Sequence, residues 1–239
     1  MLPFFLDIWG MEQYSLDLIE HLSGFVTENR LSLFKQVLSE RTRYITVLLE
    51  DIYQSQNASA VLRTCDCTGI QDVHIVEQMN EYEINRDVAL GSNQWLSLNY
   101  YNTGKNNIDD AVSILKNDGY RIVATSPHVR GTTPETFNLG LGKAAFMFGT
   151  ELNGLTERAM KLADEFIRIP MLGFTESYNI SVSAAIVLYH LRGRLDASSL
   201  DWKIGKDEQS ELLLDWLRTS IKMSGKIEEQ FRKNYYLNF

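Results

Sequence analysis

Polar side chains that could bind or move charge follow several of the apolar runs that we expect to be β-strands. Ligands of an open α/β sheet bind beyond the carboxyl ends of its strands, so these residues are the first candidates for a functional site. They are Asn57, Arg63, Thr125, Glu151, Ser177 and Asn179, and Gly149 and Ile169 occupy similar positions after strands.

Arg63 is the most informative of these residues because it follows three apolar positions, 60–62. A guanidinium is costly to bury unless it meets an anion, which could be a substrate group or a structural carboxylate. Asn57 stands near an expected helix start, where it could simply cap the helix. Six residues separate it from Arg63, about 120° around an ideal helix, so the two converge only if Asn57 precedes the first turn.

Several common enzyme classes lack their signatures in this chain. The segment after the first expected strand reads QSQNASAVLRTCDCTG, without the G-x-G-x-x-G turn of dinucleotide enzymes. A Walker A motif and a G-x-S-x-G nucleophile elbow are also missing, although Ser59, Ser126 and Ser177 offer hydroxyls. A dinucleotide enzyme, a nucleoside triphosphatase and a serine hydrolase are therefore disfavoured.

The elements that must position these residues alternate along the middle of the chain. Apolar, largely β-branched runs predict strands at 44–51, 72–77, 95–101, 120–125, 144–149 and 165–170. Helical patterns lie among them at 58–67, 108–116, 156–162 and 180–195. This alternation predicts an α/β domain with a mostly parallel sheet buried on both faces.

Helical segments flank this domain on both sides. Residues 11–40 predict two helices with Thr27 as a cap between them, and residues 207–238 predict a charged helical tail with an apolar stripe. The domain core, the N-terminal helices or a dimer partner could cover that stripe. We expect an N-terminal extension at 1–42, the central domain at 43–197 and a C-terminal extension at 198–239; whether residues 1–10 join the fold is left open.

Composition narrows the range of partners and locations. The chain has 239 residues and a formal net charge of -8, which argues against coating nucleic acid over its whole surface. Arg and Lys nevertheless gather at 41–43, 192–194 and 222–233, as solvated helix faces or as local binding patches. Apolar runs are too short to span a bilayer, and the opening residues lack the features of a signal peptide, so we expect a cytoplasmic protein.

Cys65 and Cys67 are the only cysteines. A disulfide between them would be strained, and a zinc site would lack an evident fourth ligand. We expect both to be small buried thiols and expect no metal site.

Three segments resemble the signature motifs of the TrmH family of the SPOUT superfamily. NASAVLRTCDCTG (57–69) is similar to the first motif, with its Asn, small residues, Arg-Thr pair and closing Gly. FGTELNGLT (148–156) is similar to the second, and IPMLGFTESYNISVS (169–183) to the third. They occur in the family's order and at similar intervals, and the resemblance covers most of the chain.

This resemblance implies a fold and an activity. The fold would be an α/β domain whose C-terminal segment threads through a loop to form a deep trefoil knot, a rare exception among protein folds. The protein would be a homodimer with an active site shared between subunits. It would use S-adenosylmethionine to methylate an RNA ribose 2'-hydroxyl, with a guanosine of the tRNA D-loop as the expected target.

The resemblance also assigns roles by motif position. Thr125, Gly149, Ile169 and Tyr178 would contact S-adenosylmethionine, mainly through backbone groups. Tyr178 stands where relatives often have Leu, but a backbone contact would survive that change. Asn57, Arg63, Glu151, Ser177 and Asn179 would line the reaction centre. RNA contacts are expected from Arg192, Arg194, Lys222 and Lys226.

Methyl transfer to a ribose hydroxyl requires alignment of three atoms and removal of one proton. In the family the counterpart of Arg63 is held to be the general base, yet a guanidinium titrates above about 12. We therefore expect Arg63 to hold the target phosphate or hydroxyl, and either to lose a proton transiently or to let a phosphate oxygen assist. Two alternatives are the same reaction on ribosomal RNA and a non-catalytic RNA-binding protein on the same fold.

Overall fold

The computed structural model describes residues 3–79, 85–150 and 153–237, and within these ranges the side chains of 3–12, 86, 87, 236 and 237 are left aside. The chain forms two compact units. One comprises Thr42–Trp202, and the other combines the segments up to Arg41 and from Lys203 onward.

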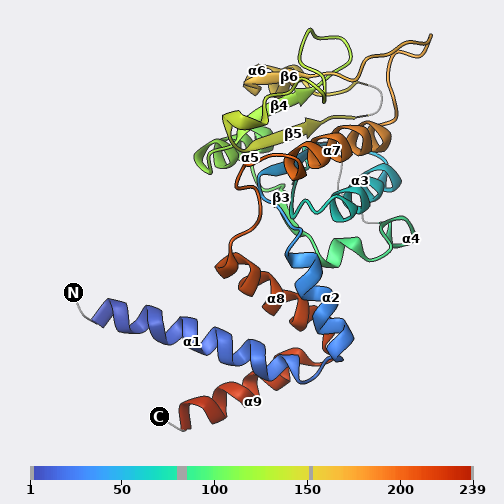
Figure 1. Ribbon diagram of the computed structural model, residues 1–239. Helices are drawn as coiled ribbons and strands as arrows, with labels where there is room; N and C mark the ends of the chain where they lie inside the picture. The colour runs from blue at the N-terminus through green and yellow to red at the C-terminus, as the bar shows by residue number, and fades with distance from the viewer. Residues whose placement is uncertain (1–2, 80–84, 151–152, 238–239) are drawn as a thin grey trace. The chain divides into compact units, whose positions relative to one another are not determined.

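The six predicted strands all form, and they make one sheet (Figure 1). They are β1 (Ile45–Glu50), β2 (Asp72–Val76), β3 (Ser97–Tyr101), β4 (Arg121–Thr125), β5 (Ala144–Phe148) and β6 (Glu165–Ile167). Their order is β3-β2-β1-β5-β4-β6, and every neighbouring pair is parallel. The prediction of a mostly parallel α/β domain is confirmed.

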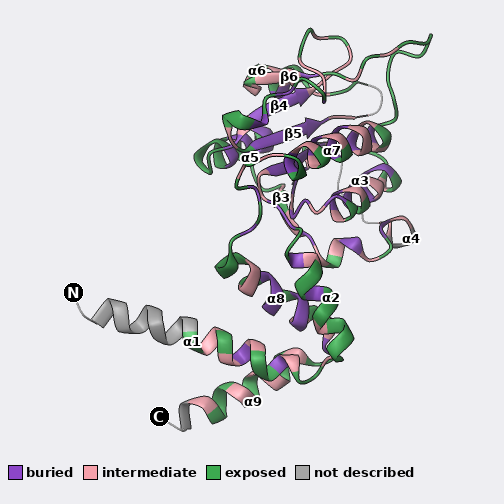
Figure 2. Ribbon diagram, viewed as in Figure 1, coloured by how far each residue is buried: buried purple, intermediate pink, exposed green. Residues whose placement is uncertain are grey.

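Helices cover both faces of this sheet, and its central strands β1 and β5 are buried along their whole length (Figure 2). The helices α3 (Ser55–Cys67) and α7 (Ile180–Asp196) pack on one face, and α5 (Asn107–Asn117) and α6 (Glu157–Leu162) pack on the other. Each face of the sheet has its own hydrophobic core, and alternate residues of β1 point into one or the other. Val47 and Leu49 face α3 and α7, whereas Leu48 faces α5. The short helices α4 (Arg86–Ala89), η1 (Ser92–Gln94) and η2 (Leu139–Leu141) were not predicted.

Strand β6 is held on both of its edges. It pairs with β4 on one side, and the Thr132 N–H donates to the Phe166 carbonyl at 3.0 Å on the other. The Arg168 N–H donates back to the Thr132 carbonyl at 2.9 Å. A Cβ on Gly131 would overlap the Phe166 backbone, so the connection between β4 and β5 lies tightly against β6.

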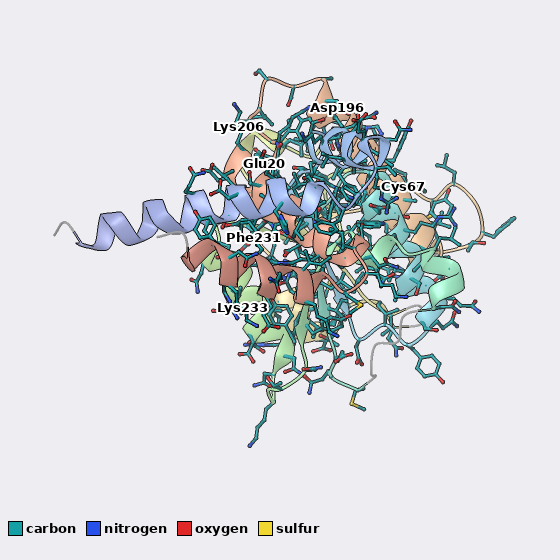
Figure 3. The ribbon with its side chains drawn as sticks, turned by 90° about the horizontal axis from the view of Figure 1, so that it is seen from below. Glu20, Cys67, Asp196, Lys206, Phe231 and Lys233 are labelled. Carbon is teal, nitrogen blue, oxygen red and sulfur yellow. The ribbon has the colours of Figure 1, made fainter. Side chains whose placement is uncertain are left out.

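The second unit consists of four helices: α1 (Pro3–Ser23), α2 (Glu28–Leu38), α8 (Lys206–Ser220) and α9 (Ser224–Leu237). Thr27 caps α2 as predicted, with its hydroxyl accepting from the Arg30 N–H at 3.2 Å. Phe34 meets the edge of Trp216 of α8, and Phe231 of α9 stacks on His21 of α1. Figure 3 shows Phe231 on α9, beside α1. The N-terminal helices therefore cover the apolar stripe of the tail.

Two details depart from the sequence interpretation. The tail is two helices rather than one, because the chain turns at Met223, whose φ is +64°. Cys65 is buried as expected, but Cys67 is exposed. Positions i and i+2 of a helix lie about 200° apart, so both thiols could not face one core.

The question left open for the first ten residues has a partial answer, since α1 begins at Pro3. Among the described residues, no helix is both long and apolar enough to cross a membrane. No group of three His, Cys, Asp or Glu side chains there is arranged to hold a metal ion.

Candidate functional site

A pocket of about 210 Å³ opens where the carboxyl ends of β4, β5 and β6 meet. The register brings these ends together, because Thr125 pairs with Ile167 and Ala124 pairs with Met147. All four residues that the resemblance assigned to the cofactor line this pocket, and so does Ser177. Its lining includes Thr125, Ser126, Gly149, Asn153, Gly154, Leu155, Ile169, Met171, Ser177, Tyr178 and Ile180.

The loop after β5 forms one wall of the pocket through a tight backbone closure. Thr150 and Gly154 exchange two backbone hydrogen bonds, each of 3.0 Å. A Cβ on Gly149 would overlap the backbone of Gly154 and Leu155, so only glycine allows this close approach. Glu151, predicted for the reaction centre, lies in this loop but outside the described residues.

Thr125 and Tyr178 meet the pocket in different ways. The Thr125 hydroxyl donates to the Met147 carbonyl at 2.7 Å, which joins the ends of β4 and β5. Tyr178 is 46% exposed at the opposite wall, in the segment between β6 and α7. Leu172 and Phe174 of the same segment are fully exposed.

Asn57 and Asn179 are brought together from the first and third motifs. The Asn179 side-chain amide donates to Asn57 Oδ1 at 3.1 Å, and Asn179 Oδ1 caps α7 by accepting from the Ser181 N–H at 2.9 Å. Asn57 lies within the first turn of α3 and donates to Gln54 Oε1 at 3.0 Å. The interpretation of Asn57 as a simple helix cap is therefore wrong, because Gln54 occupies the cap position.

Arg63 is exposed on α3, whereas Asn57 is buried, so the two side chains leave the helix in different directions. Within the described residues, the Arg63 guanidinium makes neither a hydrogen bond nor an ion pair. No described carboxylate pairs with Arg63, so the reading of this residue as half of a structural ion pair has no support among the described residues. The guanidinium is open to an external anion.

The predicted RNA-contacting residues fall into two groups. Arg192 pairs with Asp196 and lies over the Trp202 ring at 3.9 Å, and Arg194 donates to the Pro134 carbonyl at 2.6 Å. Lys222 and Lys226 are exposed near the junction of α8 and α9.

The basic residues at 41–43 have structural surroundings rather than a solvated face. Arg41 is buried over Trp216, with the guanidinium 5.2 Å from the ring centre. Arg43 pairs with Asp72 at 2.9 Å.

Sequence reasoning missed Glu50, the last residue of β1. Only 3% of its surface is exposed, and its carboxylate accepts from the Thr156 N–H at 2.8 Å and the Thr156 hydroxyl at 2.7 Å. Burial raises the pKa of this carboxyl, and the two hydrogen bonds from Thr156 oppose that rise. The signal was a charged residue at the end of an apolar run, inside the predicted strand 44–51 rather than after it.

Comparison with known proteins identifies the family of the chain. The model of the SpoU rRNA Methylase family matches residues 44–189, more than half of the chain. The chain belongs to this family. The family resemblance predicted from the three motifs is confirmed.

Individual relatives and structures agree with this membership. A tRNA (guanosine(18)-2'-O)-methyltransferase of Borreliella burgdorferi is 45% identical over 212 residues, covering 89% of this chain and 95% of the relative. An enzyme of the same name from Thermus thermophilus is 34% identical, covering 80% and 97%. The crystal structure of the A. aeolicus TrmH/SpoU tRNA modifying enzyme matches with a TM-score of 0.71 at 26% identity, covering 82% of this chain and 98% of that one.

Proposed function

We propose that this member of the SpoU family transfers a methyl group from S-adenosylmethionine to the ribose 2'-hydroxyl of guanosine 18 in the tRNA D-loop. The observation that carries the proposal is the shared name of the relatives at 45% and 34% identity, each matched over nearly its whole length. The pocket and the Asn57–Asn179 contact supply a site in keeping with that reaction.

The pocket fits a cofactor that has a flat aromatic base and several polar groups. Leu155, Ile169 and Ile180 provide apolar walls, and Ser126 and Asn153 provide polar groups, the mixture expected of a cofactor site. We assign Thr125, Gly149, Ile169 and Tyr178 to S-adenosylmethionine. When bound there, S-adenosylmethionine supplies the methyl group as a sulfonium.

Arg63, Asn57, Asn179, Ser177 and Glu151 are assigned to the reaction centre. The exposed Arg63 guanidinium holds the phosphate beside the target ribose and keeps the 2'-hydroxyl in line for displacement. The proton leaves the hydroxyl toward a phosphate oxygen, or toward Arg63 after the guanidinium has transiently given one of its own protons to water. Asn57 and Asn179 fix the start of α3 relative to the start of α7.

We further propose the trefoil knot and the homodimer of the family. In support of the knot, the connection between β4 and β5 runs along the edge of β6 that does not pair with β4. After β6 the chain continues to α7, on the face of the sheet that α3 also covers. In support of the dimer, Leu172 and Phe174 are fully exposed beside the pocket and would be covered by a second copy. Because the proposed substrate is tRNA, we also propose a cytoplasmic location.

RNA contacts are proposed for Lys222 and Lys226, whose ammonium groups are exposed. Arg192 and Arg194 would have to exchange Asp196 and Pro134 for phosphate oxygens in order to take part.

The test is transfer of labelled methyl groups from S-adenosylmethionine to purified total tRNA and, separately, to ribosomal RNA. We expect label in tRNA alone; label in ribosomal RNA alone would establish the alternative substrate. Calorimetry with S-adenosylmethionine tests the non-catalytic alternative, which predicts RNA binding without cofactor binding.

A further inference from the structure

Glu50 is the one buried carboxylate that joins the sheet to the wall of the cofactor pocket among the described residues. It ends β1, all six residues of which are buried, so its backbone is among the most firmly held in the domain. Leu49 pairs with Phe148, so Glu50 lies one step beyond the end of β5, next to the chain at Gly149.

The two oxygens of Glu50 reach a single residue on the far side of the pocket loop. Oε2 accepts the Thr156 N–H and Oε1 accepts the Thr156 hydroxyl. That hydroxyl in turn accepts from the Ala159 N–H at 3.1 Å and so caps α6. Both donors of Thr156 therefore end on the same carboxylate.

Thr156 directly follows Gly154 and Leu155, which line the pocket. Gly154 is closed against Thr150 by two backbone hydrogen bonds, and Gly149 lies directly against the backbone of Gly154 and Leu155. A displacement of Thr156 would thus be transmitted to the pocket wall through two covalently adjacent residues.

We infer that Glu50 is a positioning residue that fixes Gly154 and Leu155 in the cofactor-binding form of the pocket wall by holding Thr156 from the end of β1. This inference rests on the proposed function, because it takes S-adenosylmethionine as the occupant of the pocket. A carboxylate suits this role because the N–H and the hydroxyl of Thr156 are both donors, and each of the two carboxylate oxygens can accept one of them. Glutamine has the same shape but places an NH₂ donor where one acceptor is needed.

The test compares Glu50→Gln and Thr156→Val with two controls, Thr156→Ser, which keeps the hydroxyl, and Asp51→Asn, which removes the neighbouring carboxylate. We expect Glu50→Gln and Thr156→Val each to raise the Kd of S-adenosylmethionine in calorimetry about tenfold, the effect of losing roughly one buried hydrogen bond to a charged group. Their KM for the cofactor should rise in parallel, while kcat at saturating cofactor stays within about twofold. Both controls should bind as the wild type does.

A role limited to stability would lower the melting temperature without separating KM from kcat, and that result would overturn the inference. Unchanged cofactor affinity in Thr156→Val would overturn it even if Glu50→Gln failed to fold. A double variant no worse than either single variant would support action through this one contact. If the wild-type protein bound no S-adenosylmethionine, the proposed function would fail first, and this inference with it.

Discussion

The Asn57–Asn179 hydrogen bond joins residues of two motifs that lie 122 positions apart in the chain. Asn179 makes two different contacts through its two side-chain polar atoms. Oδ1 caps α7, and Nδ2 reaches Asn57. The types and positions of both residues could be predicted from the sequence, since each follows a strand. Their direct contact could not, because spacing along the chain does not give distance in space.

Asn179→Asp separates the two roles. An aspartate keeps the oxygen that caps α7 but loses the amide donor and turns an oxygen toward Asn57 Oδ1. We expect methyl transfer to fall at least about tenfold while the melting temperature changes little. Asn179→Ala should in addition lower the free energy of unfolding by about 1 kcal/mol, because the cap is lost. Full activity in Asn179→Asp would remove this pair from the reaction centre.

His74 is a buried histidine outside the site, and it gives the fold a specific pH dependence. Its ring nitrogen lies 2.8 Å from the Tyr101 hydroxyl, and burial lowers the pKa of His74 from 6.5 to about 4, against a smaller opposing effect of Asp118. The unfolded chain therefore binds a proton first as the pH falls below 6.5. Stability from this group is complete above that pH and is lost toward pH 4.

Urea unfolding of wild type and His74→Asn at roughly pH 7 and pH 5 measures this contribution. Wild type should lose about 2 kcal/mol more between the two conditions than the variant, which has no imidazole to protonate. If wild type and variant lost the same free energy of unfolding between these pH values, His74 would already be protonated at roughly pH 5 in the folded protein, and its pKa would not be lowered.

Among the secondary elements, the strands were the most predictable, because burial on both faces demands continuous apolar runs such as Ile45–Leu49. The break at Met223 was not predictable. A non-glycine residue takes a left-handed conformation there, and neither a proline nor a glycine marks the end of α8.

The loop after β5 depends on Gly149 more than on any side chain. In Gly149→Ala, the added methyl group would displace Gly154 and Leu155, so we expect the Kd of S-adenosylmethionine to rise at least about tenfold in calorimetry. Gly225→Ala is a matched control, because its methyl group would meet nothing within 4 Å. If Gly149→Ala bound the cofactor as well as the control does, the pocket would not be the cofactor site.

For the whole molecule, composition predicted an acidic protein without a nucleic-acid coat, and the apolar stripe of the tail predicted something to cover it. In the structure α1 and α2 cover this stripe. The sequence did not distinguish these helices from the domain core or a dimer partner. The expectations of a knot and of a dimer came from family resemblance, because neither periodicity nor composition encodes how a chain threads or with what it pairs.

With a net charge of -8, RNA binding must depend on local cations, and this has a measurable signature. Lys222→Ala and Lys226→Ala should each weaken tRNA binding and reduce the slope of log K against log salt by about 0.8. Filter binding at several salt concentrations gives this slope. Lys233→Ala is the control, since its ammonium already pairs with Glu229 at 2.7 Å, and it should change the slope less. Equal slopes in all four proteins would place the RNA surface elsewhere.

The central claim is tested most directly by mapping the methyl group on tRNA by nucleoside mass spectrometry after reaction with wild type and with Arg63→Ala. We predict 2'-O-methylguanosine at position 18 with wild type, and at least a hundredfold less (about 3 kcal/mol) with Arg63→Ala at an unchanged melting temperature. A methyl group on a base, or full activity in Arg63→Ala, would contradict the account.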